Sequence, residues 1–257
     1  MFGAASVVAL TKCGNEPPRA PTTRVSDANA GSGADAGAGE DALGNIGTDS
    51  ASADASPPCT VRPAQTEGPY FVDEMLNRSD IRSDPTDGTT KPGALLRITF
   101  RVLRIGGSAC TPLSDALVDI WQCDALGAYS DVQDSNGHFD TRGKKFLRGY
   151  QLTDQNGLAE FVTIYPGWYS GRTAHIHFKV RTNPSSPQGH VFTSQLYFDD
   201  TITDVVFAQA PYNSKGPRST TNAMDGIFQS GGKQLVLNVA PDAQGYAGTF
   251  EVGLAIA

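Results

Sequence analysis

Short runs of β-branched and aromatic residues, separated by turns rich in glycine and proline, make up most of the chain after residue 58. Such runs are typical of strands, and pairs such as Pro92-Gly93 and Asn156-Gly157 are typical of turns. The predicted strands are Leu95–Val102, Leu117–Gln122, Gly157–Ile164, His175–Val180, Phe192–Phe198, Gln234–Asn238 and Thr249–Ile256. Only Thr203–Ala210 and Ala223–Gln229 suit short helices. The pattern therefore predicts an all-β fold, an antiparallel β-sandwich with Greek-key-like connections and few short helices.

The first 58 residues have a different composition. From Asp27 to Pro58 they are mainly Ala, Gly, Ser and Asp, and Leu43 and Ile46 are the only bulky apolar residues. Such a segment cannot bury enough apolar surface to offset its chain entropy. We therefore predict a disordered acidic tether over residues 1–58 and one folded domain over residues 59–257, which has a suitable length for a single core.

The formal net charge of −7 comes largely from this tether, which contains seven of the 27 acidic residues and three of the 20 basic ones. The folded domain is thus only mildly acidic. It has neither the basic stripe of a nucleic-acid-binding protein nor an apolar run long enough to span a bilayer.

The segment Phe2–Thr11 is small and apolar, and Cys13 follows it. This pattern resembles the end of a bacterial secretory or lipoprotein signal, so we expect export to the periplasm, the cell surface or the medium, with a lipid anchor at Cys13 as one form of it. Lys12 does not fit the small residue expected before a lipid-modified cysteine. A misplaced start or plain disorder is the alternative.

Three cysteines lie in the predicted domain. Cys59 opens it and Cys110 follows a Gly-Ser-Ala turn, so a bridge between them would tie the start of the domain to its body. That bridge would close a loop of about 50 residues and contribute about 4 kcal/mol in the chain-entropy model. The alternative is that both are free thiols. Cys123 follows an apolar run and suits a buried free thiol.

His175-Ile176-His177 is the strongest indication of chemistry in the chain. Residues i and i+2 of a strand point to the same face, so both imidazoles would be presented together. Imidazole is the commonest metal ligand in proteins. Tyr169 and Arg172 precede this pair and Gln195 follows it, which would supply oxygen and cation chemistry nearby.

Several further segments occur in a fixed order around this pair. They are Thr66-Glu67-Gly68-Pro69-Tyr70, Arg78–Arg82, Asp119–Asp131, Phe146–Gly149, Thr163–Arg172, Ala174–Val180 and Ser194–Phe198. Together they resemble the intradiol ring-cleavage dioxygenases, the superfamily of protocatechuate 3,4-dioxygenase and catechol 1,2-dioxygenase, from Cys59 to the C-terminus. The chain is most similar to the secreted single-domain branch, whose members share the equivalents of Cys59 and Cys110.

The resemblance implies a metal site in which Tyr129, Tyr169, His175 and His177 bind one non-haem ferric ion, Fe(3+), with solvent hydroxide as the fifth ligand. The chemistry of the residues agrees with this expectation. A phenol has an unperturbed pKa of about 10, so tyrosine binds a metal at neutral pH only when a strong Lewis acid displaces its proton.

The resemblance also implies an activity. With O2, the enzyme would cleave a catechol-type ring between the two hydroxyl-bearing carbons and give a cis,cis-muconate. Tyr169 would leave the metal when substrate binds and take up a proton, and Arg172 would stabilise negative charge on the substrate. Gln195 would lie next to the ligand residues without binding the metal itself. Residues 1–58 offer no helical dimerisation region, so a monomer or a different homodimer is expected. Gln122 stands where many relatives have histidine.

Other interpretations of these residues remain open at this stage. Tyr129 and Tyr169 also suit packing roles, Trp121 and Trp168 suit the core or a pocket wall, and His138 and His190 suit exposed loops. A cupin-like metalloenzyme would need an acidic residue soon after His177, and Phe178–Gln188 contains none. A non-catalytic prealbumin-like binding module would account for Pro166-Gly167-Trp168-Tyr169 but not for the two histidines.

Overall fold

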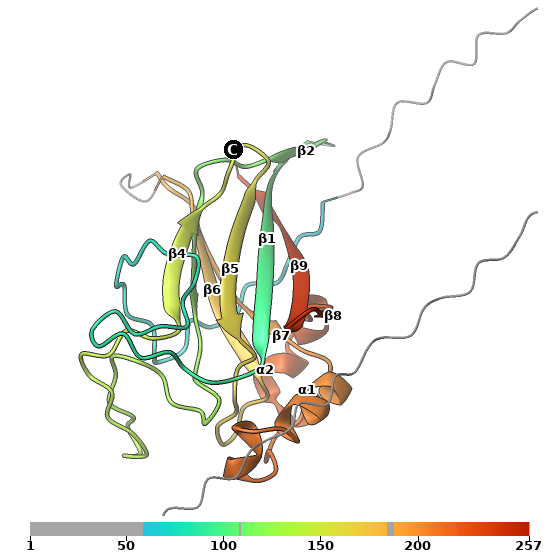
Figure 1. The fold of residues 1–257 in the computed structure, drawn as a ribbon. Coiled ribbons are helices and arrows are strands. Elements are labelled where there is room, and N and C mark those ends of the chain that lie inside the picture. Colours follow the sequence, from blue (N-terminus) through green and yellow to red (C-terminus); the bar gives the residue numbers. More distant parts are fainter. Residues whose placement is uncertain (1–58, 108, 184–187, 257) are drawn as a thin grey trace, which may run out of the picture. The chain divides into compact units, whose positions relative to one another are not determined.

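The computed structural model describes residues 59–107, 109–183 and 188–256. The expected tether over 1–58, the export signal and the anchor at Cys13 lie outside the described residues. The described part is built mainly of two β-sheets (Figure 1).

The first sheet is organised around one long strand, β1 (Leu95–Gly106). This strand pairs antiparallel with β2 (Ala109–Pro112) and β5 (Leu158–Ile164), and parallel with β9 (Gly245–Ala255). The short β8 (Ala240–Asp242) pairs with β9. Strands from the two ends of the described domain therefore lie side by side, as Figure 1 shows for β1 and β9.

The second sheet has the order β4 (Arg148–Leu152), β3 (Leu117–Trp121), β6 (His175–Arg181) and β7 (Val191–Tyr197), with all neighbours antiparallel. The chain passes from one sheet to the other after β2, β4, β5 and β7. The predicted β-sandwich is thus confirmed, and among the strand pairs of the described residues only that of β1 with β9 is parallel.

The core lies between the two sheets and follows from alternation along the strands. In β1 the buried residues include Leu96, Ile98 and Phe100. Phe100 meets Phe178 of β6 with ring centroids 5.3 Å apart and Phe250 of β9 at 6.3 Å. Each large apolar side chain buried in this way contributes about 1.5–3 kcal/mol relative to exposure.

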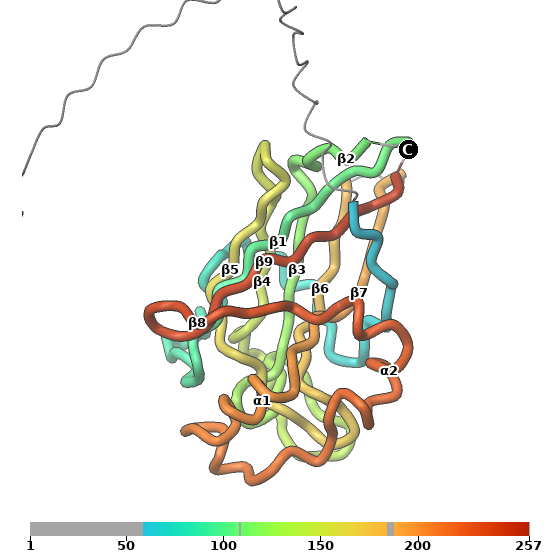
Figure 2. The backbone as a smooth tube through the Cα atoms, turned by 90° about the vertical axis from the view of Figure 1, so that its right-hand side faces the viewer, coloured from blue at the N-terminus to red at the C-terminus, as the bar shows by residue number. Residues whose placement is uncertain are grey.

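Short helices lie between β7 and β8, and Figure 2 shows this segment winding below the sheets. They are α1 (Asp200–Phe207), η1 (Tyr212–Lys215), η2 (Asn222–Met224), α2 (Gly226–Gln229) and η3 (Gly232–Leu235). The side chains of Asp199 and Asp225 accept hydrogen bonds from the first turns of α1 and α2, which begins each helix at a definite residue. None of the helices in the described residues is long and apolar enough to cross a membrane.

Two predicted boundaries need correction. The predicted strand Gln234–Asn238 is wrong, because Gly231 adopts a φ of 95° and starts the 3-10 turn η3. Only Val236 forms a bridge there, with Tyr197. The predicted helix Thr203–Ala210 begins earlier, since Asp199 caps it.

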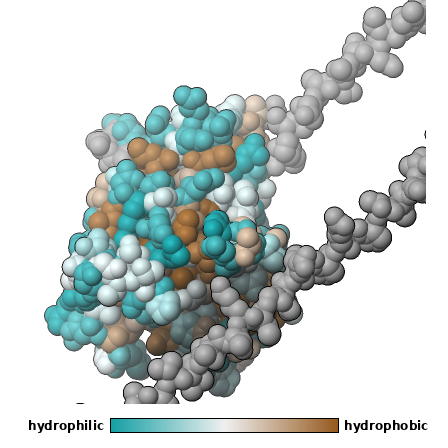
Figure 3. Space-filling view, viewed as in Figure 1, coloured by the Kyte–Doolittle hydropathy of each residue, from teal (hydrophilic) through white to brown (hydrophobic). Residues whose placement is uncertain are grey.

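A disulfide joins Cys59 to Cys110 in β2, with Cα atoms 5.7 Å apart. It fastens the start of the described domain to the first sheet, one of the two states that the sequence left open. Cys123 is a buried free thiol, as predicted. On the face drawn in Figure 3, hydrophilic residues are interspersed with smaller apolar groups.

Candidate metal centre and active site

The two histidines of β6 lie on the face of the second sheet that points away from the core. Strand alternation sends Ile176 and Phe178 inward, where both are fully buried in the hydrophobic core. His175 and His177 therefore share the opposite face, beside Trp121 of β3 and Gln195 of β7. Both imidazoles are at most 2 % exposed because loops cover this face.

Tight turns bring the two tyrosines over this face. Asp124, three residues after the end of β3, forms an Asx-type turn by accepting hydrogen bonds from the backbone N–H groups of Leu126 and Ala128, each at 3.0 Å. Gly127 follows with a φ of 92°, and a Cβ there would lie 2.4 Å from the carbonyl oxygen of Trp168. The loop of Tyr129 and the loop of Tyr169 therefore touch through backbone, which only glycine permits.

Four donor atoms converge at this place. The Nε2 atom of His175 lies 3.2 Å from Nε2 of His177, 3.2 Å from Oη of Tyr169 and 3.4 Å from Oη of Tyr129. Ligand atoms that bind one transition metal at about 2.0–2.2 Å lie about 3 Å from one another. The structure thus brings all four predicted ligands together at the spacing of a single mononuclear site.

The hydrogen bonds of His175 suit metal binding. Its Nδ1 lies 2.7 Å from the carbonyl oxygen of Thr173, which can only accept. The proton of the neutral ring is therefore on Nδ1, and the lone pair of Nε2 points to the other donors. His177 has a buried Nδ1 without a hydrogen-bond partner, and its ring is stacked on Trp121.

Electrostatics sets the protonation of the donors. Burial, and the positive charge of Arg172, lower the pKa of His175 to about 3, and burial lowers the pKa of His177 well below its usual value. Both imidazoles are therefore neutral, which is the ligand form. Burial raises the pKa of Tyr129 well above 10 and that of Tyr169 to about 12. These phenols ionise only next to a strong Lewis acid, so the donor set fits a trivalent metal ion.

The residues that the described chain offers do not fit a carboxylate-type centre. No group of three or more His, Cys, Asp or Glu residues that could hold a metal occurs within 59–107, 109–183 and 188–256. A cupin-like site needs a carboxylate beside its histidines, and the donors here are phenols instead.

Arg172 and Gln195 lie beside this cluster, as expected. Arg172 has Nη1 3.4 Å from Nε2 of His175, and its Nη2 donates to Oε1 of Gln195 at 2.6 Å. Gln195 is fully buried and its Nε2 donates to the carbonyl oxygen of Thr66 at 2.9 Å. A positive charge is thereby held at the edge of the donor cluster.

Three further residues have positions that the sequence did not predict. Gln122 faces away from the cluster, because its Nε2 donates to the carbonyl oxygen of Ile164 at 2.8 Å. Gln122 therefore lies outside the donor set. Tyr70 stacks on Tyr129 at a centroid distance of 4.7 Å. Asp225, which comes 53 residues after Arg172, forms an ion pair with it in which Oδ2 lies 2.9 Å from Nε. His138 and His190 are exposed, as predicted.

A cavity of about 410 Å³ opens beside Tyr169, between Leu126, His138, Phe139 and Trp168. Lys215 also lines it, but its ammonium group donates to the carbonyl oxygens of Leu126 and Trp168. Tyr169 is the one donor residue that is more than slightly exposed, so this side gives the donor cluster its access from outside.

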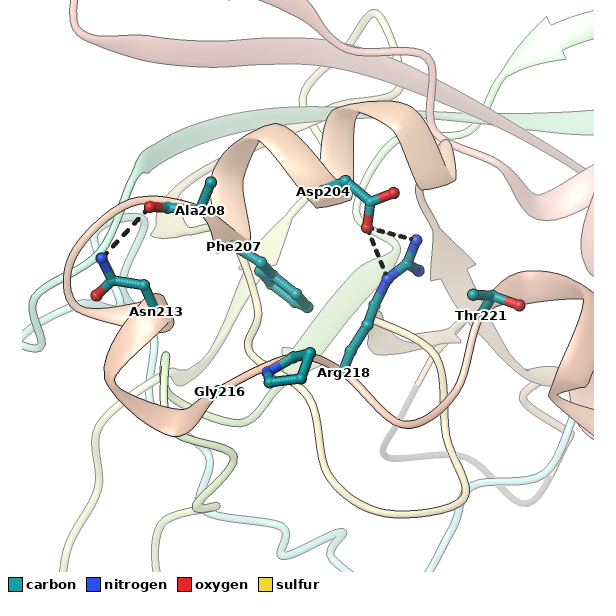
Figure 4. A pocket seen from close by; sticks show the side chains of 8 residues that line it. Asp204, Phe207, Ala208, Asn213, Gly216, Arg218 and Thr221 are labelled. Carbon is teal, nitrogen blue, oxygen red and sulfur yellow. Dashed lines mark hydrogen bonds and ion pairs between the residues drawn. The ribbon is translucent and has the colours of Figure 1, made fainter.

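A second hollow, of about 510 Å³, lies between α1 and residues 213–221 (Figure 4). Arg218 is its only cationic lining residue, and the guanidinium pairs with Asp204 at 2.8 Å and also with Asp200. The charge is thus already balanced, and the hollow holds none of the donor residues.

A β-sandwich with two histidines and two tyrosines facing one point defines a candidate mononuclear metalloprotein. Comparison with known proteins gives its family: a family model described as Dioxygenase matches residues 66–218, more than half of the chain. The chain belongs to the intradiol ring-cleavage dioxygenase family.

Individual relatives agree with this assignment. Catechol 1,2-dioxygenase 2 of Acinetobacter lwoffii is 33 % identical over 150 residues, which are 53 % of this chain and 51 % of the relative. The solved intradiol ring-cleavage dioxygenase of Tetranychus urticae is 32 % identical with a TM-score of 0.66, over 77 % of this chain and 95 % of that structure. A dioxygenase domain from Streptomyces sp. SirexAA-E is 28 % identical with a TM-score of 0.53. The chain spans about half the length of the curated relatives it matches.

Proposed function

We propose that this protein is a non-haem Fe(III) dioxygenase that uses O2 to cleave a catechol-type ring between its hydroxyl-bearing carbons and gives a cis,cis-muconate. The observation that carries the proposal is that the hydroxyl oxygens of two tyrosines and Nε2 of His177 all lie within 3.4 Å of Nε2 of His175. Relatives named as catechol and chlorocatechol 1,2-dioxygenases support the substrate class.

Tyr129, Tyr169, His175 and His177 would hold the iron. When bound, Fe(III) supplies the Lewis acidity that ionises the phenols and activates a catecholate ring toward O2. The chain itself excludes water from the donor atoms, since Tyr129, His175 and His177 are at most 2 % exposed. In such surroundings each fixed charge acts more strongly than in water.

Tyr169 is suited to exchange with substrate. It lines the cavity and is more exposed than the other three ligands. The burial that raises the pKa of its free phenol to about 12 also means that a released Tyr169 Oη readily holds a proton. We therefore assign to Tyr169 the uptake of one proton from an incoming catechol.

The positive guanidinium of Arg172 would stabilise the negative charge that develops on the substrate ring. Burial disfavours the charged form of Arg172, but nearby Tyr169 and Asp225 raise its pKa above the usual value, so the guanidinium stays charged. Fixed donors of this kind are typically worth about 3–4 kcal/mol each in a transition state. Gln195 holds the guanidinium at its Nη2 end.

Metal analysis, a visible spectrum and oxygen uptake test the proposal. The purified protein is expected to contain one iron per chain, to be coloured by tyrosinate-to-iron charge transfer, and to consume O2 with catechol, hydroxyquinol or protocatechuate. Tyr129→Phe is expected to lose colour, iron and activity, whereas Tyr150→Phe, a matched control on β4 of the same sheet, keeps them. If Tyr129→Phe and Tyr169→Phe both retain colour, iron and oxygen uptake, the proposal is wrong.

We also propose that the protein works outside the reducing cytoplasm. The support is the Cys59–Cys110 disulfide, a bond that persists mainly in oxidising compartments. Fractionation of producing cells tests this: recovery of the protein only in the cytoplasm, with both thiols free, would contradict it.

A further inference from the structure

Asp225 is fully buried and uses both carboxylate oxygens. Oδ2 accepts hydrogen bonds from Nε of Arg172 at 2.9 Å and from the backbone N–H of Thr173 at 3.0 Å. Oδ1 accepts from the backbone N–H groups of Ile227 at 2.8 Å and Phe228 at 3.1 Å, in the first turn of α2. One carboxylate therefore joins α2 to the loop that leads into β6.

This contact fixes the direction of the Arg172 guanidinium. The group is planar, with donors on Nε, Nη1 and Nη2 in a rigid fork. Asp225 holds the Nε side and Gln195 accepts from Nη2 at 2.6 Å. With two corners of the plane held, the third corner, Nη1, is left facing Nε2 of His175 at 3.4 Å.

A second set of hydrogen bonds returns from Gln195 to α2. The hydroxyl of Tyr197 lies 3.0 Å from Oε1 of Gln195 and 2.7 Å from Oε1 of Gln65. Gln65 in turn donates from Nε2 to the carbonyl oxygens of Ile227 at 3.0 Å and Ser230 at 3.1 Å. The α2 segment thus contacts Arg172 through Asp225 and, through Gln65, lies against the hydroxyl of Tyr197 next to Gln195.

Asp225 lies beyond residues 66–218, the part of the chain that the family model matches. It comes 53 positions after Arg172 in the sequence. A buried carboxylate from outside the matched region therefore provides the counter-charge of the arginine next to the donor cluster.

We propose that Asp225 is a positioning residue, which orients the Arg172 guanidinium toward the bound substrate and thereby makes α2 part of the active site. This inference rests on the proposed ring-cleavage function. Asp225 acts through Arg172 and does not touch the donor cluster itself. Its removal should therefore lower the rate of ring cleavage while leaving the four donor residues in place.

The test compares Asp225→Asn with Asp199→Asn. Asp199 also caps a helix, α1, by accepting from the backbone N–H of Thr201 at 2.8 Å, and within the described part of the chain its side chain forms hydrogen bonds only in that cap. Asparagine remains a good N-cap in both variants. We expect kcat with catechol to fall about tenfold to a hundredfold in Asp225→Asn and to change less than twofold in Asp199→Asn, with iron content and the visible spectrum unchanged in both.

A thermodynamic cycle with Arg172→Gln separates positioning from a general structural role. If Asp225 acts through Arg172, the Asp225→Asn change has little further effect on kcat once Arg172 is absent. Equal losses in the presence and absence of Arg172, or a kcat in Asp225→Asn equal to that of Asp199→Asn, overturn the proposal. Should Asp225→Asn fold poorly, Asp225→Glu replaces it, and is expected to keep the charge but lower kcat by displacing the guanidinium.

A metal-free measurement separates failure of this inference from failure of the proposed function. In the apoprotein, the Nε–H of Arg172 should give a slowly exchanging ¹⁵N NMR signal that is absent in Arg172→Gln. This signal should move or be lost in Asp225→Asn and stay in Asp199→Asn. An unchanged signal in Asp225→Asn contradicts the positioning role directly, whereas an inactive wild-type protein with the expected NMR result contradicts only the ring-cleavage function.

Discussion

The imidazole of His177 lies flat against the indole of Trp121, with ring centroids 5.1 Å apart and planes inclined by 7°. Since Nδ1 of His177 is buried and has no hydrogen-bond partner, packing sets the orientation of this ring. Trp121 is the neighbour of His177 on β3, and Gly68 approaches the His177 ring from the loop that covers the sheet. His175 differs, because a backbone carbonyl fixes its ring.

Replacing Trp121 by leucine should therefore weaken metal binding. The His177 ring would lose its stacking surface and sample orientations in which Nε2 points away from the other donors. We expect the affinity for iron, measured by competition with a chelator, to fall about tenfold, the lower end of what outer-shell changes cost. Ile120→Val, on the core side of the same strand, serves as the control, and an equal loss of affinity there would contradict the explanation.

Replacing Gly68 by alanine should act on the same ring from the other side. The φ of Gly68 is 73°, and an added Cβ would lie 3.0 Å from Cε1 of His177. Gly88 is a matched control, because its φ is 75° and an added Cβ would meet nothing within 4 Å. Both variants should lose about 1 kcal/mol of stability from the left-handed backbone. Only Gly68→Ala is expected to lose colour or iron, and identical iron binding in the two would refute this role.

The buried carboxyl group of Asp119 should make the free energy of unfolding depend on pH. Asp119 is 8 % exposed on β3, and burial raises its pKa to about 7 although Arg181 lies 3.2 Å away and opposes the shift. The folded protein therefore holds a proton that the unfolded chain, with a pKa near 3.8, releases. The contribution of Asp119 to the free energy of unfolding should fall as the pH rises from about 4 to 7, by at most about 1.4 kcal/mol per pH unit, and level off above 7. His175 and His177, whose pKa values are lowered, contribute with the opposite sign in this range, so the fall is measured as the difference between the wild type and Asp119→Asn.

Urea unfolding at several pH values checks this expectation. Asp119→Asn should remove this fall with rising pH. Asp73, which also binds Arg181, has a lowered pKa because of that hydrogen bond, and its negative charge helps to raise the pKa of Asp119. Asp73→Asn should therefore keep the fall but end it at a lower pH. A wild-type profile parallel to that of Asp119→Asn would show that Asp119 is ionised throughout.

The disulfide should contribute to stability through the unfolded state. Cys59 and Cys110 are 51 positions apart, so the bond restricts a long loop in the unfolded chain. The double variant Cys59→Ser/Cys110→Ser is expected to lose about 4 kcal/mol in the free energy of unfolding while keeping iron and activity. Reducing agent should destabilise the wild-type protein to the same extent and leave the double variant unaffected. A loss of activity without loss of stability would contradict this account.

The sequence was sufficient for the sandwich, which depends on local patterns, and for the pairing of the two histidines, whereas the two tyrosines were proposed as ligands from the resemblance to a known family. Alternation in His175-Ile176-His177 puts the two imidazoles on one face whatever surrounds them. Glycines such as Gly127 mark turns that the loops need. The predicted strand at Gln234–Asn238 was wrong because the left-handed Gly231 and the packing of Leu235 in the core override the β propensity of a short run.

Contacts between distant segments were beyond local patterns. The carboxylate of Asp225 looks like an ordinary helix cap before Gly226-Ile227-Phe228, and only the folded chain brings it to Arg172. Tyr70 belonged to a recognised segment, yet its stacking on Tyr129 depends on how the covering loop is laid over the sheet. In both cases the sequence indicates a local role for one residue but does not indicate its contact with the other.

The parallel pairing of β1 and β9 has a consequence for biosynthesis. During translation β1 emerges early, yet one of its long edges stays without hydrogen-bond partners until residues 245–255 have left the ribosome. A polypeptide ending before that point would keep an open edge beside the core, a surface prone to aggregation. Nonsense or frameshift mutations that remove residues 245–255 should thus lead to loss of the protein through chaperones and proteases, and not simply shorten it.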